Sequence, residues 1–488
     1  MSKVSKLQME DIITICNKHP YLIVFSIAFI LRIVPEILAF PYPIGYDVIN
    51  YYLPLIKNFE GYWPTISNQF PFYVSLLYSI SEVFRVNPRL VISASIVFVF
   101  GLFSIAIFSI GRNLLRLDNL QCIFLSIFVI FQVAVLRTSW DLHKDMLALT
   151  LTFFSLLFIS KIPNLSKKLI AVSAALSFVS VLVDRMIGLL LSVTLIGSSF
   201  VRKDRGLAVV AVIVIVIYGL SLQANHDNIG YNLKIAYSNN SINEIYNPLN
   251  LIVLFIVMNA ILLPSGIIGF IQSKLIIFKI PLLISGIGSF TWIIFPNTSA
   301  LLPDRWIIIF SIFLSLFSGY GFITLIENRR IAIFSRKFNN YLIVLFPFLF
   351  LGSAFVASPN NSYINIYNIF HQFIGPYGPL TMQSNSIYLP ESRSLLSAID
   401  WINNDTNTSE DSVIMGSKHL RGWMELELKE RTFLFADNNT KLLESDKYGE
   451  LYLLELKSAH STKIPGNYQQ ELTYNNTDFY LYRLILIE

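Results

Sequence analysis

The sequence predicts an all-α polytopic membrane bundle of about eleven transmembrane helices, followed by a small C-terminal α/β domain outside the membrane. Three observations support this fold class. Only 14% of the 488 residues are charged, whereas a soluble protein has about a quarter. Many apolar runs reach about 17–23 residues, enough to cross a hydrocarbon layer of about 30 Å as helices. The last part of the chain is polar and carries Asp, Glu and Lys freely.

The apolar runs define the expected spans within a membrane domain covering residues 1–357. A long outer loop, at about 41–88, is expected to carry interfacial helices. Segment 70–86 is a further candidate span, which Glu82 and Arg85 interrupt. The eleven spans are expected near 20–40, 89–111, 119–136, 142–160, 168–183, 186–200, 206–222, 249–271, 275–295, 306–326 and 340–357.

Lys and Arg concentrate in alternate short loops, which predicts that these loops are cytoplasmic. With eleven spans the N-terminus is cytoplasmic and residues 358–488 are extracytoplasmic, as in a multi-pass cell-membrane protein. The net charge of +5 then reflects topology, and we expect no nucleic-acid partner. Cys16 and Cys122 indicate neither a disulfide framework nor a metal site. The basic loops lie near residues 3–18, 112–116, 161–168, 202–205, 274–279 and 329–337.

Glycosylation sequons give a second indication of topology. Asn-x-Ser/Thr triplets on the predicted outer side outnumber the single one on the inner side, although an Asn- and Ser-rich chain also produces them by chance. The inner triplet starts at Asn164, and the outer ones start at Asn239, Asn297, Asn360, Asn404, Asn407, Asn438 and Asn475.

The polar tail, residues 358–488, has the patterns of a small α/β domain. The stretch "SLLSAIDWINNDT" predicts a helix with Leu395, Leu396, Ile399 and Ile402 on one face. "DSVIMGS" predicts a short buried strand, and "DFYLYRLILIE" alternates as a strand does.

Charged residues gather at the predicted outer ends of the spans. Ionisable groups inside a bilayer cost about 2.5–3.5 kcal/mol each at a helix centre, so several on one face indicate a polar cavity. We expect Asp141, Lys144 and Asp145 to project together from one helical face. The charged residues at the predicted outer ends are Asp47 in "IGYDVINYYLPLIKN", the cluster in "RTSWDLHKDML", Asp184 with Arg185, and Asp304 with Arg305.

Each charge also has a structural interpretation. Asp184 and Arg185 could form a solvated turn, and Asp304 and Arg305 an interfacial anchor. Arg32 and Glu36 fit an i,i+4 ion pair. His143 is interpreted as structural. Asp47 could cap a short amphipathic helix lying along the outer interface, because Asp serves well at an N-cap.

With these motifs the chain resembles the GT-C superfamily of integral-membrane glycosyltransferases. The branch it resembles includes protein O-mannosyltransferases and the aminoarabinose transferases of lipid A, with archaeal and bacterial members. The carrying motifs are "GYDVINYY", "RTSWDLHKDMLAL", "DRMIGLLL", "PDRWIIIF" and, in the polar tail, "HLRGWMELEL". The resemblance covers the whole layout, but each motif is short.

The resemblance implies a transfer of sugar from a polyprenyl-phosphate donor to a protein, lipid or glycan acceptor at the outer face of the membrane, with inversion. Asp47 would be the catalytic base. Lys144, Arg185 and Arg305 would bind the donor phosphate. Asp141, Asp145, Asp184 and Asp304 would support them. The first loop has one Asp and no Asp-x-Asp motif, which is unlike the metal-dependent oligosaccharyltransferase branch, so we expect no metal or other cofactor.

Three other functions remain open from the sequence. A transporter or flippase of lipid-linked glycans also needs many spans, but its charges should lie near the midplane of the membrane. A ligase or polymerase of surface polysaccharide would use the same class of donor and transfer a whole glycan. A scaffold would bind partners through its outer tail.

Overall fold

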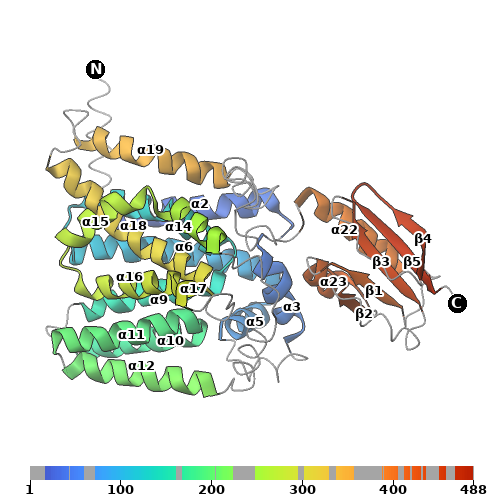
Figure 1. Ribbon diagram of the computed structural model, residues 1–488, viewed down its shortest axis with the longest axis horizontal. Coiled ribbons are helices and arrows are strands. Elements are labelled where there is room, and N and C mark those ends of the chain that lie inside the picture. The colour runs from blue at the N-terminus through green and yellow to red at the C-terminus, as the bar shows by residue number, and fades with distance from the viewer. Residues whose placement is uncertain are drawn as a thin grey trace.

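The structure, a computed structural model, is a helical bundle with a C-terminal sheet beside one end of it (Figure 1). The residues between the bundle and the first helix of the sheet region lie outside the described residues, as does the predicted domain boundary at 357/358. The described residues are 17–42, 44–59, 72–160, 167–203, 205–223, 248–294, 302–328, 337–356, 387, 389–404, 412–417, 420–429, 432–435, 450–457 and 468–486.

Helices occupy every region where the sequence predicts a span. They are α2 (Pro20–Ala39), α5 (Phe72–Phe84), α6 (Pro88–Asn113), α7 (Asn119–Ile130), α8 (Val133–Trp140), α9 (His143–Ile159), α10 (Lys167–Val183), α11 (Arg185–Arg202), α12 (Arg205–Gln223), α14 (Pro248–Asn259), α15 (Leu262–Gln272), α16 (Ile276–Ser289), α17 (Thr291–Ile294), α18 (Pro303–Glu327) and α19 (Lys337–Val356). In the outer loop, the short π-helix η1 (Val48–Tyr52) continues into α3 (Leu53–Lys57).

Among the described residues, five helices are long and apolar enough to cross a membrane, or up to seven if each of two bent pairs is one span. The chain is therefore an integral membrane protein, and the number of eleven spans stays a prediction. The prediction of one continuous helix is wrong for two spans, 119–136 and 249–271. The chain bends by 62° between α7 and α8, and by 67° between α14 and α15. Pro264, near the start of α15, has no N–H to continue the helix of α14.

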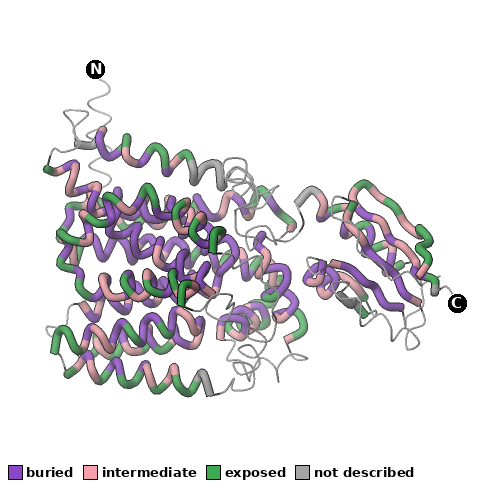
Figure 2. Tube along the Cα trace, in the orientation of Figure 1, coloured by how far each residue is buried: buried purple, intermediate pink, exposed green. Residues whose placement is uncertain are grey.

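Small and hydroxylated residues join the helices of the bundle. A Cβ on Gly269 of α15 would overlap the backbone of Phe317 in α18, so the two backbones are in contact. Ser155 of α9 lies 2.6 Å from Ser177 of α10, oxygen to oxygen. Figure 2 shows exposed residues on the outside of the bundle. Many of them have large apolar side chains, which suit contact with membrane lipid. On α12 these include Val209, Val212, Ile213, Val216 and Leu220.

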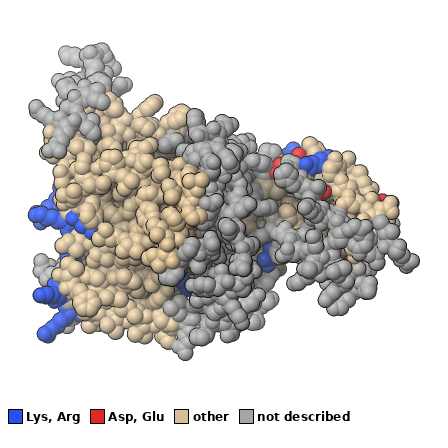
Figure 3. All heavy atoms as spheres, viewed as in Figure 1, with Lys and Arg blue, Asp and Glu red and all other residues tan. Residues whose placement is uncertain are grey.

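The two ends of the bundle differ in charge. At the end far from the sheet, the Arg202 guanidinium donates to the Ile159 carbonyl, with 3.0 Å between nitrogen and oxygen. This hydrogen bond joins the ends of α11 and α9. Figure 3 shows Lys and Arg side chains gathered at this end, on the face in view. Exposed basic residues at these helix ends and turns include Arg112, Arg116, Arg202, Lys203 and Lys274.

The C-terminal region is a five-stranded mixed sheet in the order β2-β1-β3-β5-β4. Strand β1 is parallel to β2 and to β3, whereas β5 is antiparallel to β3 and to β4. The elements are α22 (Leu389–Asn404), β1 (Val413–Gly416), α23 (Arg421–Glu427), β2 (Thr432–Phe435), β3 (Leu451–Leu456), β4 (Tyr468–Asn475) and β5 (Phe479–Leu486).

The helix and the two strands predicted from the tail are present as α22, β1 and β5. Leu395, Ile399 and Ile402 of α22 are fully buried, and they form one core with Trp423 of α23. Leu396 packs at the edge of this core. Among the predicted sequons, those at Asn404, the last residue of α22, and Asn475, in β4, fall within the described residues.

Candidate active site

The candidate site lies at the end of the bundle that faces the C-terminal sheet, where η1 follows α2 and α9 follows α8 (Figure 1). The backbone N–H of Asp47 donates to the Asp141 carboxylate, Oδ1, at 2.8 Å. Residues 94 positions apart in the chain are thereby joined. The Asp47 side chain makes no capping hydrogen bond to its helix, so the capping interpretation is wrong.

Gly45 allows this approach. Its φ of +101° is a conformation that side chains disfavour. A Cβ there would lie 2.6 Å from the Trp140 carbonyl oxygen and 3.4 Å from the Asp141 Cα. The loop can therefore lie directly against the junction of α8 and α9 only because residue 45 has no side chain.

The junction of α8 and α9 is a break in the helix, at Asp141 and Leu142. The prediction that Asp141, Lys144 and Asp145 share one helical face is wrong, because Asp141 ends α8 and the other two belong to α9. The broken helix leaves carbonyls at the end of α8 without helical partners. Arg32 donates to the Ser139 carbonyl at 3.0 Å, and a ring nitrogen of His143 lies 3.1 Å from that of Trp140.

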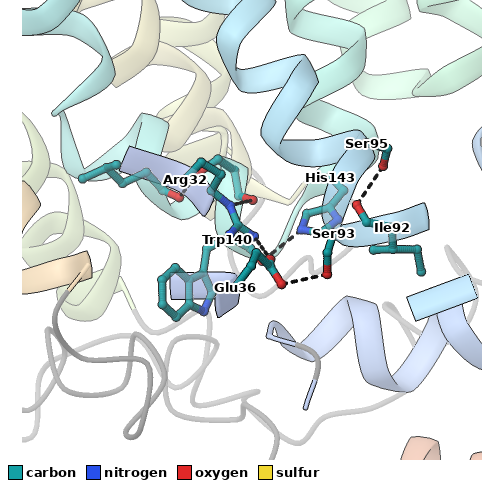
Figure 4. A network of polar contacts seen from close by, with 9 residues as sticks. Arg32, Glu36, Ile92, Ser93, Ser95, Trp140 and His143 are labelled. Carbon is teal, nitrogen blue, oxygen red and sulfur yellow. Dashed lines mark hydrogen bonds and ion pairs between the residues drawn. The ribbon is translucent and has the colours of Figure 1, made fainter. Parts of the chain in front are cut away.

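Figure 4 shows Arg32, Trp140 and His143 in one network with Glu36 and Ser93. Arg32 pairs with Glu36 at 2.6 Å, as the i,i+4 spacing predicts. Ser93 of α6 donates to the same carboxylate at 2.8 Å. The His143 ring stacks on Tyr52 of η1, with 6.0 Å between ring centres. This network fixes the helix break that presents Asp141, in line with the structural interpretation of Arg32 and His143.

Two ion pairs bring the predicted cations beside the acids. Arg305, at the start of α18, lies 3.6 Å from the Asp145 carboxylate, N to O. Lys144 lies 3.4 Å from the Asp184 carboxylate. Charge-assisted hydrogen bonds are usually about 2.7–2.9 Å long, so these pairs are loose. Lys144 and Arg305 keep 36% and 27% of their side-chain surface exposed, so their N–H groups can still bind an anion.

The remaining predicted residues surround these pairs. Asp184 is buried and caps α11, accepting from the Ile187 N–H at 2.9 Å, so it is not a solvated turn. Asp304 is buried beside Arg305, as one of its electrostatic neighbours. Arg185 is half-buried, and its electrostatic neighbours are Asp184 and Tyr218 of α12. Arg185 thus shares the neighbour Asp184 with Lys144.

Asp47 lies outside the membrane-spanning helices, half-buried within the charge cluster. Burial, and next to it the Asp141 carboxylate, raise the pKa of Asp47 to about 7, against the pull of Arg305 and Lys144. A carboxyl group with this pKa can take a proton near neutral pH, which suits a general base.

Two contributors were not among the residues singled out in the sequence. Arg137 of α8 is buried, and it is an electrostatic neighbour of both Asp47 and Asp141. Its position four residues before Asp141 was the available signal. Gly45 is the other, and the sequence "IGYD" gives no sign of its positive φ. Among the described residues, no three His, Cys, Asp or Glu side chains are grouped as a metal site.

The fold, a helical membrane bundle with an attached C-terminal sheet, is similar to that of two solved structures of ArnT. The chain is similar to ArnT from Cupriavidus metallidurans, in a crystal structure with bound undecaprenyl phosphate, at 12% identity and a TM-score of 0.52, over 95% of this chain and 96% of that one. The apo structure of ArnT gives 11% identity and a TM-score of 0.51, over 99% and 98%. No family model and no curated protein sequence matches the chain.

Proposed function

We propose that this protein is a membrane glycosyltransferase that moves a sugar from a polyprenyl-phosphate donor to an acceptor hydroxyl. The observation that carries the proposal is Asp47 among Arg305, Lys144 and Arg137 at one end of a bundle with the ArnT fold. A carboxylate for a proton and cations for a phosphate are the two functions that this reaction needs. The ArnT structure with undecaprenyl phosphate supports the class of donor.

In the proposed reaction, Asp47 takes the proton of the acceptor hydroxyl. The oxygen forms a bond to the anomeric carbon, and the bond from that carbon to the phosphate oxygen breaks with its electron pair. The configuration inverts, because attack and departure are on opposite faces. Arg305 and Lys144 stabilise the charge that develops on the phosphate. Arg185, beside Asp184, is assigned a smaller contribution than these two, because it is not among the main electrostatic neighbours of Asp47.

The acids beside the cations have a positioning role in this proposal. Asp145 and Asp184 orient Arg305 and Lys144, and Asp304 adds to the orientation of Arg305. Asp141 fixes the backbone of Asp47. The mechanism needs no metal or other cofactor. The acceptor is a protein, lipid or glycan.

The position of the cluster favours a transferase over a transporter or flippase. The charged groups lie at helix ends and junctions, whereas a transporter site belongs near the middle of the membrane. A ligase or polymerase of surface glycans shares the donor chemistry and is separated from the proposed function by the size of the transferred group.

The proposed orientation of the protein in the membrane is based on the basic residues at one end of the bundle. We place this end and the N-terminus in the cytoplasm and the sheet outside the cell membrane. The test is labelling with an impermeant maleimide in a background without Cys16 and Cys122. It should reach Gln470→Cys in β4 from outside, and Lys203→Cys only after the membrane is opened. The reverse pattern would put the site on the cytoplasmic face and contradict the proposal.

The direct test uses native membranes and synthetic undecaprenyl-phosphate hexoses and pentoses carrying a radiolabelled sugar. The protein should release undecaprenyl phosphate and transfer the label, and a chelator should leave the rate unchanged. Absence of transfer from every such donor, with undecaprenyl phosphate itself failing to bind, would contradict the proposal. Transfer of a single labelled residue, and not of a preassembled glycan, separates it from the ligase or polymerase function.

A further inference from the structure

Helix α23 of the C-terminal region meets η1 directly behind Asp47. The Gly422 N–H donates to the Asn50 side-chain oxygen at 3.0 Å. The amide nitrogen of the same side chain donates to the Tyr46 carbonyl at 3.1 Å. One buried side chain thus connects α23 to the peptide group that joins Tyr46 to Asp47.

The two backbones approach as closely as glycine allows. A Cβ on Gly422 would lie 2.6 Å from the Asn50 Cα and would also overlap the Ile49 carbonyl. Ile49 is fully buried, and its side chain belongs to the same apolar core as Trp423 and Met424. The segment that carries Asp47 is therefore partly built into the core of the C-terminal region.

Polar contacts fasten both sides of this junction. Lys57, at the end of α3, donates to the Leu426 carbonyl. Arg89, at the start of α6, pairs with Glu427. The Trp423 ring lies edge-on to Tyr42, with 6.3 Å between ring centres. Three parts of the membrane region, before and after η1, thus hold α23 in one place.

We propose that α23 positions the base: through Gly422 and Asn50 it fixes the rotation of η1 and thereby the direction of the Asp47 carboxylate. The proposal rests on the proposed function, in which Asp47 is the base. Asn50 and Gly422 are positioning residues, because they act on the backbone of residues 46 and 47. A displacement of about 1 Å at a reacting group can lower a rate about 10²-fold, so this contact governs turnover more than donor binding.

The first variant is Gly422→Ala, whose new methyl group must push α23 away from η1. We expect kcat to fall at least tenfold while KM for the donor changes less than twofold. The acid limb of the pH–rate profile should also move to lower pH, because water reaches Asp47. Asp141, Arg305, Lys144 and Arg137, which face Asp47, are unchanged in this variant. A fold defect alone would lower the amount of active enzyme and leave the limb in place.

The matched control is Asn403→Ala. The side chain of Asn403 in α22 donates to the Glu427 carbonyl and accepts from the Lys429 N–H, both at 2.9 Å. The substitution removes these two hydrogen bonds within the C-terminal region, neither of which involves η1. Its kcat and its acid limb should stay close to those of the wild type.

A charge exchange covers the case in which Gly422→Ala does not fold. Arg89→Glu should lower kcat by repelling Glu427, and adding Glu427→Arg should restore most of it. Asp47→Asn is measured in parallel. The positioning role alone would be overturned if Asp47→Asn is inactive while Gly422→Ala has a normal kcat and an unmoved acid limb. If only Arg89→Glu folds, the same result in that variant would overturn it. An active Asp47→Asn would overturn the role of Asp47 as the base.

Discussion

Two ion pairs near the same end of the bundle contain the same chemical groups and differ in how they are held. Arg32 and Glu36 are 2.6 Å apart and retain 1% and 10% of their side-chain surface. Arg305 and Asp145 are 3.6 Å apart, and Arg305 retains 27%. Arg32 has a further partner, the Ser139 carbonyl, which it caps. The closed pair stabilises a helix break, whereas the open pair leaves a cation accessible to a ligand.

The largest expected effect comes from breaking the closed pair. Arg32→Ala leaves the mostly buried Glu36 side chain without its cation, which costs up to about 3–5 kcal/mol of folding free energy. The measurement is thermal unfolding of the protein in detergent. Arg305→Ala is the comparison, and it should cost less, because Arg305 is partly exposed and Lys144 remains as a second cation near Asp145. Equal losses in the two variants would remove the distinction between the pairs.

The next effect concerns the loop that lies on the helix break. Gly45→Ala should lower the transfer rate about 10²-fold, because its Cβ would displace Asp47 from Asp141. Donor binding should stay within a few-fold of the wild type. Gly219→Ala, at a helical position with open space around it, is the control and should have normal activity. A normal rate in Gly45→Ala would show that the approach of the loop is unimportant.

Substitutions of the partly exposed cations Arg305 and Lys144 should weaken binding of the donor. Arg305→Lys should weaken binding of undecaprenyl phosphate about tenfold, because Lys lacks the two-pronged contact that Arg makes with phosphate. Arg305→Ala should weaken it further, and Lys144→Ala should resemble Arg305→Lys. Arg185→Ala should have the smallest effect of the three sites. If both Arg305 variants bind normally, Arg305 serves as an anchor and Lys144 becomes the main phosphate ligand.

The smallest effect is on the pH dependence of stability. The pKa of Asp47 in the folded protein, about 7, exceeds the ordinary value for Asp of about 3.9. The folded state therefore binds this proton more readily than the unfolded state does, and stability falls as pH rises through about 7. Asp47→Asn should lack this decrease and unfold at a higher temperature than the wild type at pH 8. A parallel decrease in both proteins would assign it to another group.

The sequence predicted the helices and one ion pair because each depends on short-range patterns. Apolar runs gave the positions of α2, α6 and α18, and the alternation in "DFYLYRLILIE" gave β5. The i,i+4 spacing gave the Arg32–Glu36 pair.

The breaks in the helices could not be read in the same way. The stretch from Asn119 to Trp140 is apolar on both sides of Gln132, and a single Gln does not predict the bend near Phe131. The separation of Asp141 from Lys144 and Asp145 depends on Arg32 and Gly45, which are distant in the sequence. The contact of Gly422 with Asn50 spans 372 positions and has no local signal. Tertiary contacts decide these features.

The central claim is that Asp47 acts as the general base, and the pH–rate profile of wild type and Asp47→Asn tests it most directly. In the wild type the transfer rate should rise with pH and level off above about 7, because only the carboxylate takes a proton. Asp47→Asn should bind undecaprenyl phosphate normally, transfer at least about 10²-fold more slowly and lack this limb. Near-normal transfer by Asp47→Asn would contradict the account, and Asp141 or Asp145 would become the next candidate.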